Sequence, residues 1–471
     1  MPLITEVLVN ALPPQPLSPL DGRYSSAVSS LAEHLSEAGL NRARVEVEVE
    51  WIIHLTNNRL FGTTPISAET QGKLRLAYLD FGQAEIDWLA EKERTTRHDV
   101  KAVEYLVRDR LSQLGLDHLA ELTHFALTSE DVNSTSYALT VKRAVTETWL
   151  PAFRGVIEKL RGMSLDLADA AMLSRTHGQP ATPSTMGKEL GVFVWRLERV
   201  LKRIEATEYM AKFSGATGTW SAHLAAAPQV AWPNITREFV EGPLSLTFNP
   251  LTTQIESHDW QAELYDHVKH AGAILHNLAQ DIWTYISLGF FTQIPVAGAT
   301  GSSTMPHKIN PIKFENAEAN LEIAGGLFAT LAQTLVTSRM QRDLTDSTTQ
   351  RNIGVAFGHS LLALTNLSGG LDQISLSRET LLDDLDHNWE VLAEAIQTVI
   401  RAEVVAGRSQ ISDPYALLKD LTRGHRIGAA DLAEFVNGLD IGEEAKARLI
   451  ALTPATYTGL AEKVVRVKLE K

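Results

Sequence analysis

The sequence predicts an all-α protein built on a central bundle of long antiparallel helices. Apolar residues recur three and four positions apart over segments that are too long for strands, and strand-like alternation is almost absent. The stripe that includes Leu264, Leu275 and Ile282 shows this spacing most clearly. A long helix buries its apolar stripe only by packing against other long helices. We therefore expect the bundle to pair with the same bundle in another subunit. Stripes of this kind occupy residues 150–167, 190–204, 264–282, 321–335 and 353–367.

Length and composition indicate an ordered globular protein with several folding units. The chain has 471 residues, of which 44% are hydrophobic and 21% charged, a balance typical of folded proteins. We predict an N-terminal helical region at 1–118, the long-helix bundle at 119–372 and a C-terminal helical region at 373–471. The first 17 residues are rich in proline and are expected to form a loosely held tail.

Charge and cysteine content exclude several classes of function. The formal charge of −14 repels nucleic acids and anionic membranes, so neither is an expected partner. The chain has no cysteine, which excludes disulfides, thiolate metal sites and thiol nucleophiles. It has no apolar run of about 18 residues and no N-terminal signal, so we expect a cytoplasmic protein. An anionic substrate would have to be bound by a local cluster of Arg and Lys.

The strongest candidate for chemistry is the polar segment GSSTMPHKINP at residues 301–311. Its first four residues are rich in hydroxyls, and we expect them to be flexible, as in loops that close over a substrate. Asn310 followed by Pro311 predicts a helix start, with Asn310 as the N-cap and a helix running through Asn316. The amides at such a start can receive an anion. A polar loop between two helices is the alternative interpretation.

A second polar segment, SRTHGQPATP at residues 174–183, places a histidine between turn-forming residues. A histidine in isolation is more often structural than catalytic. Here Gly178 and two prolines restrict the backbone around His177, and Thr182 followed by Pro183 predicts a helix start. We therefore interpret His177 as a positioned functional side chain.

Three further polar segments interrupt the apolar stripes. Residues 94–100 and 123–131 contain His98 and His124, and Thr128 with Asp131 has the spacing of a capping box. In residues 342–351, Ser347 and Gln350 have the same spacing, which predicts a helix N-terminus. Its amides and hydroxyls, together with Arg351, would bind a phosphate. A solvated helix cap with a surface arginine is the competing interpretation.

At the 301–311 segment the chain resembles the fumarase, aspartase and argininosuccinate lyase superfamily, whose members share Gly-Ser-Ser-x-Met-Pro-x-Lys-x-Asn-Pro. The segments DGRY at 21–24, TQIE at 253–256 and 342–351 narrow the resemblance to the adenylosuccinate lyase family, from about Ser18 to the C-terminus. Fumarases and argininosuccinate lyases bind no nucleotide phosphate. The predicted phosphate site therefore distinguishes the families.

The resemblance implies an elimination reaction that releases fumarate from adenylosuccinate and from the succinylated imidazole precursor SAICAR. It implies that Ser302 removes the proton and that His177 donates a proton to the departing nitrogen. Lys308 is suited to stabilise the carbanion. It also implies a homotetramer with active sites shared among subunits, small-molecule substrates and no cofactor. His267 and His270 lack an evident third ligand, so no metal site is expected.

By the same resemblance, Arg23, Tyr24, Arg342, Ser347 and Arg351 would bind the phosphate and ribose. Thr128, Ser129, Gln254, Ser303 and Asn316 would orient the succinyl group. Arg97 and Lys313 depart from bacterial relatives, in which the first position can be Asn and the second acidic. The remaining expected substrate contacts are His98, Asp99, Ile309, Asn310, Thr348, Thr349 and Gln350, together with Arg97 and Lys308.

Two other functions remain open from the sequence. One is a superfamily lyase acting on a different fumarate-yielding substrate, as argininosuccinate lyases and fumarases do. The other is a non-catalytic structural protein on a lyase scaffold. A scaffold of that kind would tolerate loss of its proton-transfer residues, whereas His177, Ser302 and Lys308 are all present.

Overall fold

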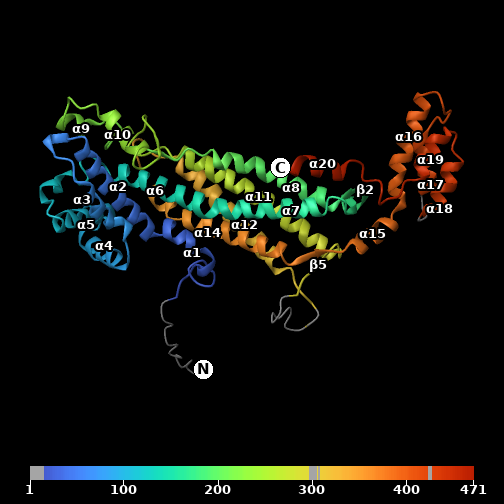
Figure 1. The fold of residues 1–471 in the computed structure, drawn as a ribbon, viewed down its shortest axis with the longest axis horizontal. Helices are drawn as coiled ribbons and strands as arrows, with labels where there is room; N and C mark the ends of the chain where they lie inside the picture. Colours follow the sequence, from blue (N-terminus) through green and yellow to red (C-terminus); the bar gives the residue numbers. More distant parts are fainter. Residues whose placement is uncertain (1–14, 296–304, 306–307, 423–426, 471) are drawn as a thin grey trace, which may run out of the picture. The chain divides into compact units, whose positions relative to one another are not determined.

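Helices make up most of the chain (Figure 1), and in the part that the structure describes the short strands form three two-stranded sheets. The computed structural model describes residues 15–295, 305, 308–422 and 427–470. The all-α prediction is confirmed. The chain divides into two compact units. Unit 1 comprises Met1–Phe153, Val200–Ala273 and Ala319–Thr365, and unit 2 comprises Arg154–Arg199, Ile274–Glu318 and Asn366–Lys471.

All five predicted apolar stripes lie on helices. In unit 1 the ring centroids of Tyr265 and Phe328 are 5.7 Å apart, and those of Phe328 and Phe357 are 5.0 Å apart. These three buried rings join the helices α11, α12 and α14 within that unit. The five helices are α7 (Leu150–Asp166), α8 (Met186–Glu205), α11 (Asp259–Ser287), α12 (Ile312–Leu335) and α14 (Ile353–Leu371).

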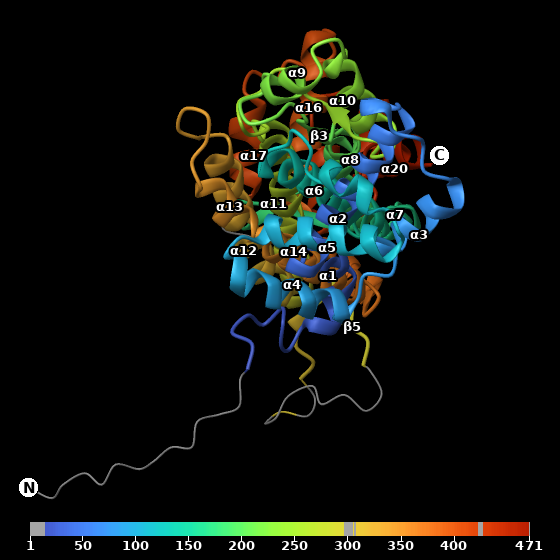
Figure 2. The same ribbon diagram turned by 90° about the vertical axis from the view of Figure 1, so that its left-hand side faces the viewer.

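The rest of unit 1 is organised around α2 (Glu37–Asn57), which contacts α3 (Ala68–Leu79), α5 (Asp99–Gln113) and α6 (Ser129–Arg143) (Figures 1 and 2). Because α2 has neighbours on several sides, it buries charged residues as well as apolar ones. The remaining elements of unit 1 are α1 (Ser25–Leu35), η1 (Leu60–Gly62), α4 (Gln83–Thr96), η2 (Asp117–Leu122), the π-helical η3 (Ala144–Trp149), β3 (Met210–Ala211), α9 (Ser221–Ala226), α10 (Trp232–Glu241), β4 (Thr247–Phe248) and α13 (Thr345–Gln350).

Unit 2 contains two antiparallel strand pairs and a group of C-terminal helices with a core of its own. Leu392, Ile400, Val436 and Leu449 belong to this core. The division into regions 1–118, 119–372 and 373–471 stays a prediction. No helix within the described residues is long and apolar enough to cross a membrane. The elements are β1 (Ala171–Thr176), β2 (Gln179–Thr185), β5 (Phe291–Gln293), β6 (Ile374–Leu376), α15 (Arg378–Asp386), η4 (Trp389–Leu392), α16 (Ala393–Val405), α17 (Pro414–Thr422), α18 (Ala429–Asn437), α19 (Glu443–Ile450) and α20 (Ala461–Leu469).

Candidate active site

His177 lies at the tip of the β1–β2 hairpin in unit 2. Thr176 pairs with Gln179, so His177 and Gly178 form a two-residue turn. Their φ values are +54° and +73°, and two positive values are typical of a type I′ turn. Glycine adopts such a conformation without strain, whereas a histidine is held there only by the surrounding pairing. The hairpin therefore fixes the backbone of His177.

The predicted helix start at Thr182 and Pro183 is wrong. Both residues belong to β2, and the following helix, α8, begins at Met186. From the turn at His177 and Gly178 the two strands pair in order, as far as Ser174 opposite Ala181. Thr182 and Pro183 lie at the register irregularity between the Ser174–Ala181 and Met172–Ser184 pairs, so strand pairing on both sides of them holds them in β2 despite the local N-cap signal.

The sides of this hairpin are anchored, whereas its tip is exposed. Arg175 Nη2 donates to Asp384 Oδ1 at 2.8 Å, and its guanidinium lies 5.5 Å from the ring centre of Phe290. On the other strand the Thr182 hydroxyl donates to Glu394. The side chain of His177 is exposed. A fixed backbone with an accessible imidazole suits a group that delivers a proton to a bound substrate.

The segment before α12 carries further candidates of unit 2, while Ser302 and Ser303 lie outside the described residues. Gln293 Nε2 donates to the Ile309 carbonyl at 2.7 Å, which ties the segment to β5. The Lys308 amide donates to the Met305 carbonyl at 3.0 Å. Lys308 is exposed, and Ile309 and Asn310 are adjacent to it in the same tethered segment.

The helix predicted after Asn310 is present but begins one residue later, at Ile312. The carbonyl of Pro311, rather than that of Asn310, accepts the first helical hydrogen bond, from Glu315 N at 3.3 Å. Asn316 lies in this first part of α12, where its Oδ1 accepts a hydrogen bond from Asn366 Nδ2 at 2.9 Å. The helix start therefore lies close to where the sequence predicts it.

In unit 1, the junction between α4 and α5 holds Arg97, His98 and Asp99. Arg97 ends α4 with a φ of +53°, and His98 is the N-cap of α5, where its Nδ1 accepts from Lys101 N at 3.2 Å. The carboxylate of Asp99 lies 2.9 Å from Arg44 and 3.3 Å from Arg351. Burial opposes ionisation of Asp99, but the two arginines and a backbone amide outweigh it and lower its pKa. Asp99 thus joins this junction to the 342–351 segment.

The capping box predicted at Ser347 and Gln350 is wrong. The N-cap of the short helix α13 is Leu344, three residues before Ser347, and the helix runs from Thr345 to Gln350. Asp343 Oδ1 accepts a hydrogen bond from the Thr345 amide at 2.9 Å. Asp343, rather than Ser347, is therefore the side chain that binds an amide at the start of the helix. This bond also contributes to the lowered pKa of Asp343. Ser347 is left inside the helix, where it does not form an anion-binding N-terminus.

The hydroxyl and guanidinium groups predicted to bind phosphate still come together. Ser347 Oγ accepts from Arg351 Nη1 at 2.7 Å. Arg342 lies 2.9 Å from Glu130 and 3.5 Å from Asp346. The Thr348 side chain is exposed and that of Thr349 half-buried on the same helix, whereas Gln350 is buried. Arg351 is therefore the most accessible cation of this segment, with its side chain 42% exposed.

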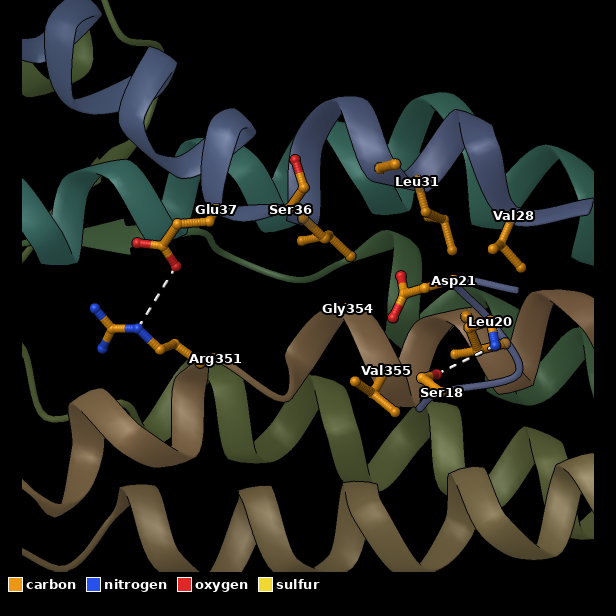
Figure 3. A pocket seen from close by; sticks show the side chains of 13 residues that line it. Ser18, Leu20, Asp21, Val28, Leu31, Ser36, Glu37, Arg351, Gly354 and Val355 are labelled. Carbon is orange, nitrogen blue, oxygen red and sulfur yellow. Dashed lines mark hydrogen bonds and ion pairs between the residues drawn. The ribbon is translucent and has the colours of Figure 1, made fainter. Parts of the chain in front are cut away.

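A cavity of about 340 Å³ in unit 1 lies beside Arg351 (Figure 3). Its polar lining includes Asp21 and Glu37, and Glu37 lies 3.5 Å from Arg351. Arg23 and Tyr24 immediately precede α1, and Val28 of α1 forms a buried cluster with Leu20 and with Leu362 of α14. The side chain of Arg351 is exposed in both pairs, whereas Glu37 is exposed and Asp99 is half-buried, so an anion can compete for the guanidinium on its exposed side.

The start of α6 carries Thr128 and Ser129 in unit 1. As the sequence predicts, Asp131 reaches back to the N-cap: its Oδ2 accepts the Thr128 amide at 2.8 Å. The first turn of α6 also contains Glu130, whose pKa is raised by burial. Gln254 belongs to the loop before α11, and its carbonyl accepts a hydrogen bond from Lys212 at 2.9 Å.

His124 precedes this turn and is held by a buried carboxylate. Its Nδ1 lies 2.6 Å from Glu48 Oε1, and its amide donates to Glu48 Oε2 at 2.8 Å. Burial alone would lower the pKa of His124, but the hydrogen bond and charge of Glu48 outweigh burial and raise it. Glu48 therefore stabilises the protonated form of His124 more than water does for a free histidine.

Comparison with known proteins identifies the family. The family model described as Lyase matches residues 22–324, and the one described as Adenylosuccinate lyase C-terminal matches residues 338–458. Adenylosuccinate lyase of Vibrio cholerae is 46% identical over 447 residues, which cover 94% of this chain and 97% of that protein. The Escherichia coli K12 protein of the same name is 45% identical, with 94% and 96% covered. The chain belongs to the adenylosuccinate lyase family.

Solved structures agree with this family in fold. A 3-carboxy-cis,cis-muconate lactonizing enzyme from Pseudomonas putida has a TM-score of 0.74 at 20% identity, covering 95% of this chain and 98% of that chain. A fumarate lyase from Mesorhizobium sp. BNC1 has a TM-score of 0.74 at 19% identity, with 94% and 97% covered. At these identities the similarity establishes the fold alone.

Several residues that hold the candidate site of this adenylosuccinate lyase family member were missed in the sequence. Glu130 was missed, although its place beside Asp131 in the first turn of a predicted helix was an available signal. For Asp131 the sequence predicted the capping contact with Thr128 but not the ion pair with Lys212. Asp346 lies 3.8 Å from His258, and both are buried. No local pattern marks Lys212, because its partners Asp131 and Gln254 lie far away in the sequence. The substrate roles of the candidate residues stay predictions.

Proposed function

We propose that this chain eliminates fumarate from adenylosuccinate to give AMP, and from SAICAR to give the aminoimidazole carboxamide ribotide AICAR, in purine biosynthesis. The observation that carries the proposal is the similarity to curated adenylosuccinate lyases along 94% of the chain. The positioned His177 and the cluster of Ser347 with Arg351 provide groups that fit this chemistry.

The reaction requires two proton movements. One proton leaves the carbon beside a carboxylate, and the carbon–nitrogen bond breaks as the electron pair forms the double bond of fumarate. The departing nitrogen then receives a proton. We assign the first step to Ser302 and the second to His177. No net oxidation occurs, so the elimination needs no redox cofactor.

Charge stabilisation and substrate orientation are assigned to separate groups. The ammonium of Lys308, in the segment before α12, would stabilise the carbanion as it delocalises into its carboxylate. Arg23, Tyr24, Arg342, Ser347 and Arg351 would bind the phosphate and ribose. The succinyl group would be oriented by Thr128, Ser129, Gln254, Ser303 and Asn316.

The substrate assignment is tested by incubating the purified protein separately with adenylosuccinate, SAICAR, argininosuccinate and malate. We expect fumarate and AMP in equal amounts from adenylosuccinate, fumarate from SAICAR, and no fumarate from the other two. Fumarate from argininosuccinate or malate alone would assign the chain to another superfamily activity. A folded protein that releases fumarate from none of them would favour a structural role.

We further propose that the enzyme is a cytoplasmic homotetramer whose active sites combine residues of different subunits. A subunit-mixing experiment tests the sharing of sites. Purified His177→Gln and Arg351→Met proteins are unfolded together and refolded, and activity is compared with that of each variant refolded alone. Shared sites would include some that contain both native residues, so activity should return. An unchanged low activity would contradict sharing between these two residues.

A further inference from the structure

Lys212 is a fully buried cation outside the set of candidate substrate ligands. Its side chain is 0% exposed, as is that of Asp131, and Lys212 Nζ lies 2.8 Å from Asp131 Oδ1. The ammonium also donates to the carbonyls of Gly215 at 2.7 Å and Gln254 at 2.9 Å. An ammonium has three protons to donate, so these three acceptors satisfy it.

Asp131 extends the contact to the start of α6. Its Oδ2 accepts the Thr128 amide at 2.8 Å, and its Oδ1 accepts the Ser214 amide at 2.9 Å. The Gly215 amide also reaches this carboxylate, at 3.2 Å. One ion pair therefore connects three chain segments: the start of α6, the loop at 212–218 and the loop at 252–256.

The two loops are also in close backbone contact. A Cβ atom added to Gly218 would lie 2.2 Å from the Thr252 carbonyl oxygen, and the φ of Gly218 is +71°. Only glycine fits this approach without displacing the neighbouring backbone. The loop at 212–218 is thus packed tightly between the other two segments, and a shift in one would be transmitted to its neighbours.

A contribution to folding stability alone does not explain why this buried ion pair is present. Removing two charges from water is costly, and replacing a buried ion pair with apolar groups of similar size is often neutral or stabilising. Directional hydrogen bonds to backbone groups do provide what apolar packing does not, a defined relative position of the segments. Two of these segments carry candidate ligands of the succinyl group, Thr128 and Ser129 on one and Gln254 on the other.

We propose that Lys212 and Asp131 are positioning residues that hold the Gln254 loop in register with Thr128 and Ser129, so that both can orient the succinyl group. This inference rests on the proposed function. Within the described residues, the pair forms no hydrogen bond with the candidate phosphate ligands at 342–351. Its effect should therefore fall on succinyl orientation rather than on phosphate binding.

The test uses the full-length paired variant Lys212→Met/Asp131→Asn, because a single substitution would leave an unpaired buried charge and destabilise folding. We expect kcat/KM for adenylosuccinate to fall at least about thirtyfold, whereas the Kd for AMP stays within about threefold of wild type. A parallel loss of AMP binding, or kcat/KM within about threefold of wild type, would overturn the positioning role.

A matched control is the pair Glu50→Gln/Arg75→Met, between α2 and α3. Arg75 Nε lies 2.6 Å from the largely buried Glu50, and neither residue is a candidate ligand. The control should change the melting temperature without changing kcat/KM. If both paired variants lose kcat/KM in proportion to their loss of stability, the contribution of Lys212 and Asp131 is structural only.

Amide hydrogen exchange separates failure of this inference from failure of the proposed function. If the wild-type protein released no fumarate, the proposed function would fail. Even then, the rate of amide hydrogen exchange at 128–131 and 252–256 in the paired variant would show whether Lys212 and Asp131 hold these two segments in place. We expect it to be at least about tenfold faster than in wild type while exchange in α2 and α3 is unchanged. Unchanged exchange at both segments would overturn the inference.

Discussion

The candidate ligands of unit 1 and the candidate proton donor of unit 2 are held in different ways. In unit 1, buried charged groups such as Asp131, Lys212 and Glu130 connect the segments that carry the ligands. In unit 2, His177 projects from a hairpin turn that is fixed by strand pairing and is itself exposed. Groups that recognise a substrate benefit from a rigid network, whereas a proton donor must remain accessible. The two regions should therefore respond differently to substitution.

The largest expected effect is that of His177→Gln, which removes the proton donor and retains a polar side chain. We expect kcat for adenylosuccinate to fall on the order of a thousandfold, because proton-transfer groups contribute about a hundredfold to ten-thousandfold. KM should change little. Steady-state kinetics measure both values. His270→Gln, at an exposed site on α11, is the control. Activity of His177→Gln within about tenfold of wild type would exclude this role.

Arg351→Met should have a smaller effect of a different kind. Loss of charge-assisted hydrogen bonds to a phosphate should lower kcat/KM about tenfold to a hundredfold, mainly by raising KM. The melting temperature should hardly change, because Arg351 is exposed and the half-buried Asp99 keeps its ion pair with Arg44. Arg378→Met, which removes an exposed ion pair with Asp169, is the matched control. A loss confined to kcat would contradict a binding role for Arg351.

A buried histidine of unit 1 provides a third contrast with His177. His223 is 0% exposed, and among the described residues neither of its ring nitrogens has a hydrogen-bond partner. Burial lowers its pKa from 6.5 to about 4. Because the unfolded chain binds the proton more readily, the stability contributed by neutral His223 is present above pH 6.5 and is lost as the pH falls toward 4.

This titration should destabilise the wild-type protein by about 2 kcal/mol between pH 7.5 and pH 5. His223→Met removes the titrating group and keeps an adaptable apolar side chain. We expect the free energy of unfolding of this variant to fall by about 2 kcal/mol less than that of wild type over the same range. Denaturant unfolding at both pH values measures the difference. Equal pH dependence of the two proteins would refute the assignment.

The smallest expected effect concerns the turn beside His177. Gly178 has a φ of +73°, and an added Cβ would meet no atom within 4 Å. Gly178→Ala should therefore cost about 1 kcal/mol through backbone strain alone. Gly155→Ala, in α7 and also with open space, should instead stabilise by about 0.5–1 kcal/mol. Thermal unfolding of both variants provides the comparison, and stabilisation by Gly178→Ala would argue against the left-handed turn.

The sequence predicted the parts of the structure that depend on local or periodic signals. All five apolar stripes are helices, because one face of each is buried along its length. The start of α6 was also predicted, since Asp131 reaches Thr128 within one turn. The helix predicted after Asn310 begins one residue late, a shift that is small on the scale of a helix boundary.

The errors arose where a local signal competed with a different partner. Thr182 and Pro183 resemble a helix start, but the His177–Gly178 turn places them in a strand opposite β1. Ser347 and Gln350 have capping-box spacing, but Asp343 accepts the amide at an earlier helix start. The pair of Lys212 with Asp131 joins segments far apart in the sequence, so no local pattern could predict it. Ser302 and Ser303 lie outside the described residues, and their roles stay predictions.

The central claim is that residues of unit 1 bind the nucleotide and that His177 of unit 2 transfers a proton. It is tested most directly by comparing kcat/KM for adenylosuccinate and for its phosphate-free nucleoside in wild type, Arg351→Met and His177→Gln. Wild type should prefer the phosphorylated substrate. His177→Gln should lower both values equally and keep this preference, whereas Arg351→Met should reduce the preference at least about tenfold. If the preference for the phosphorylated substrate changed equally in both variants, the separate roles of Arg351 in phosphate binding and of His177 in proton transfer would be contradicted.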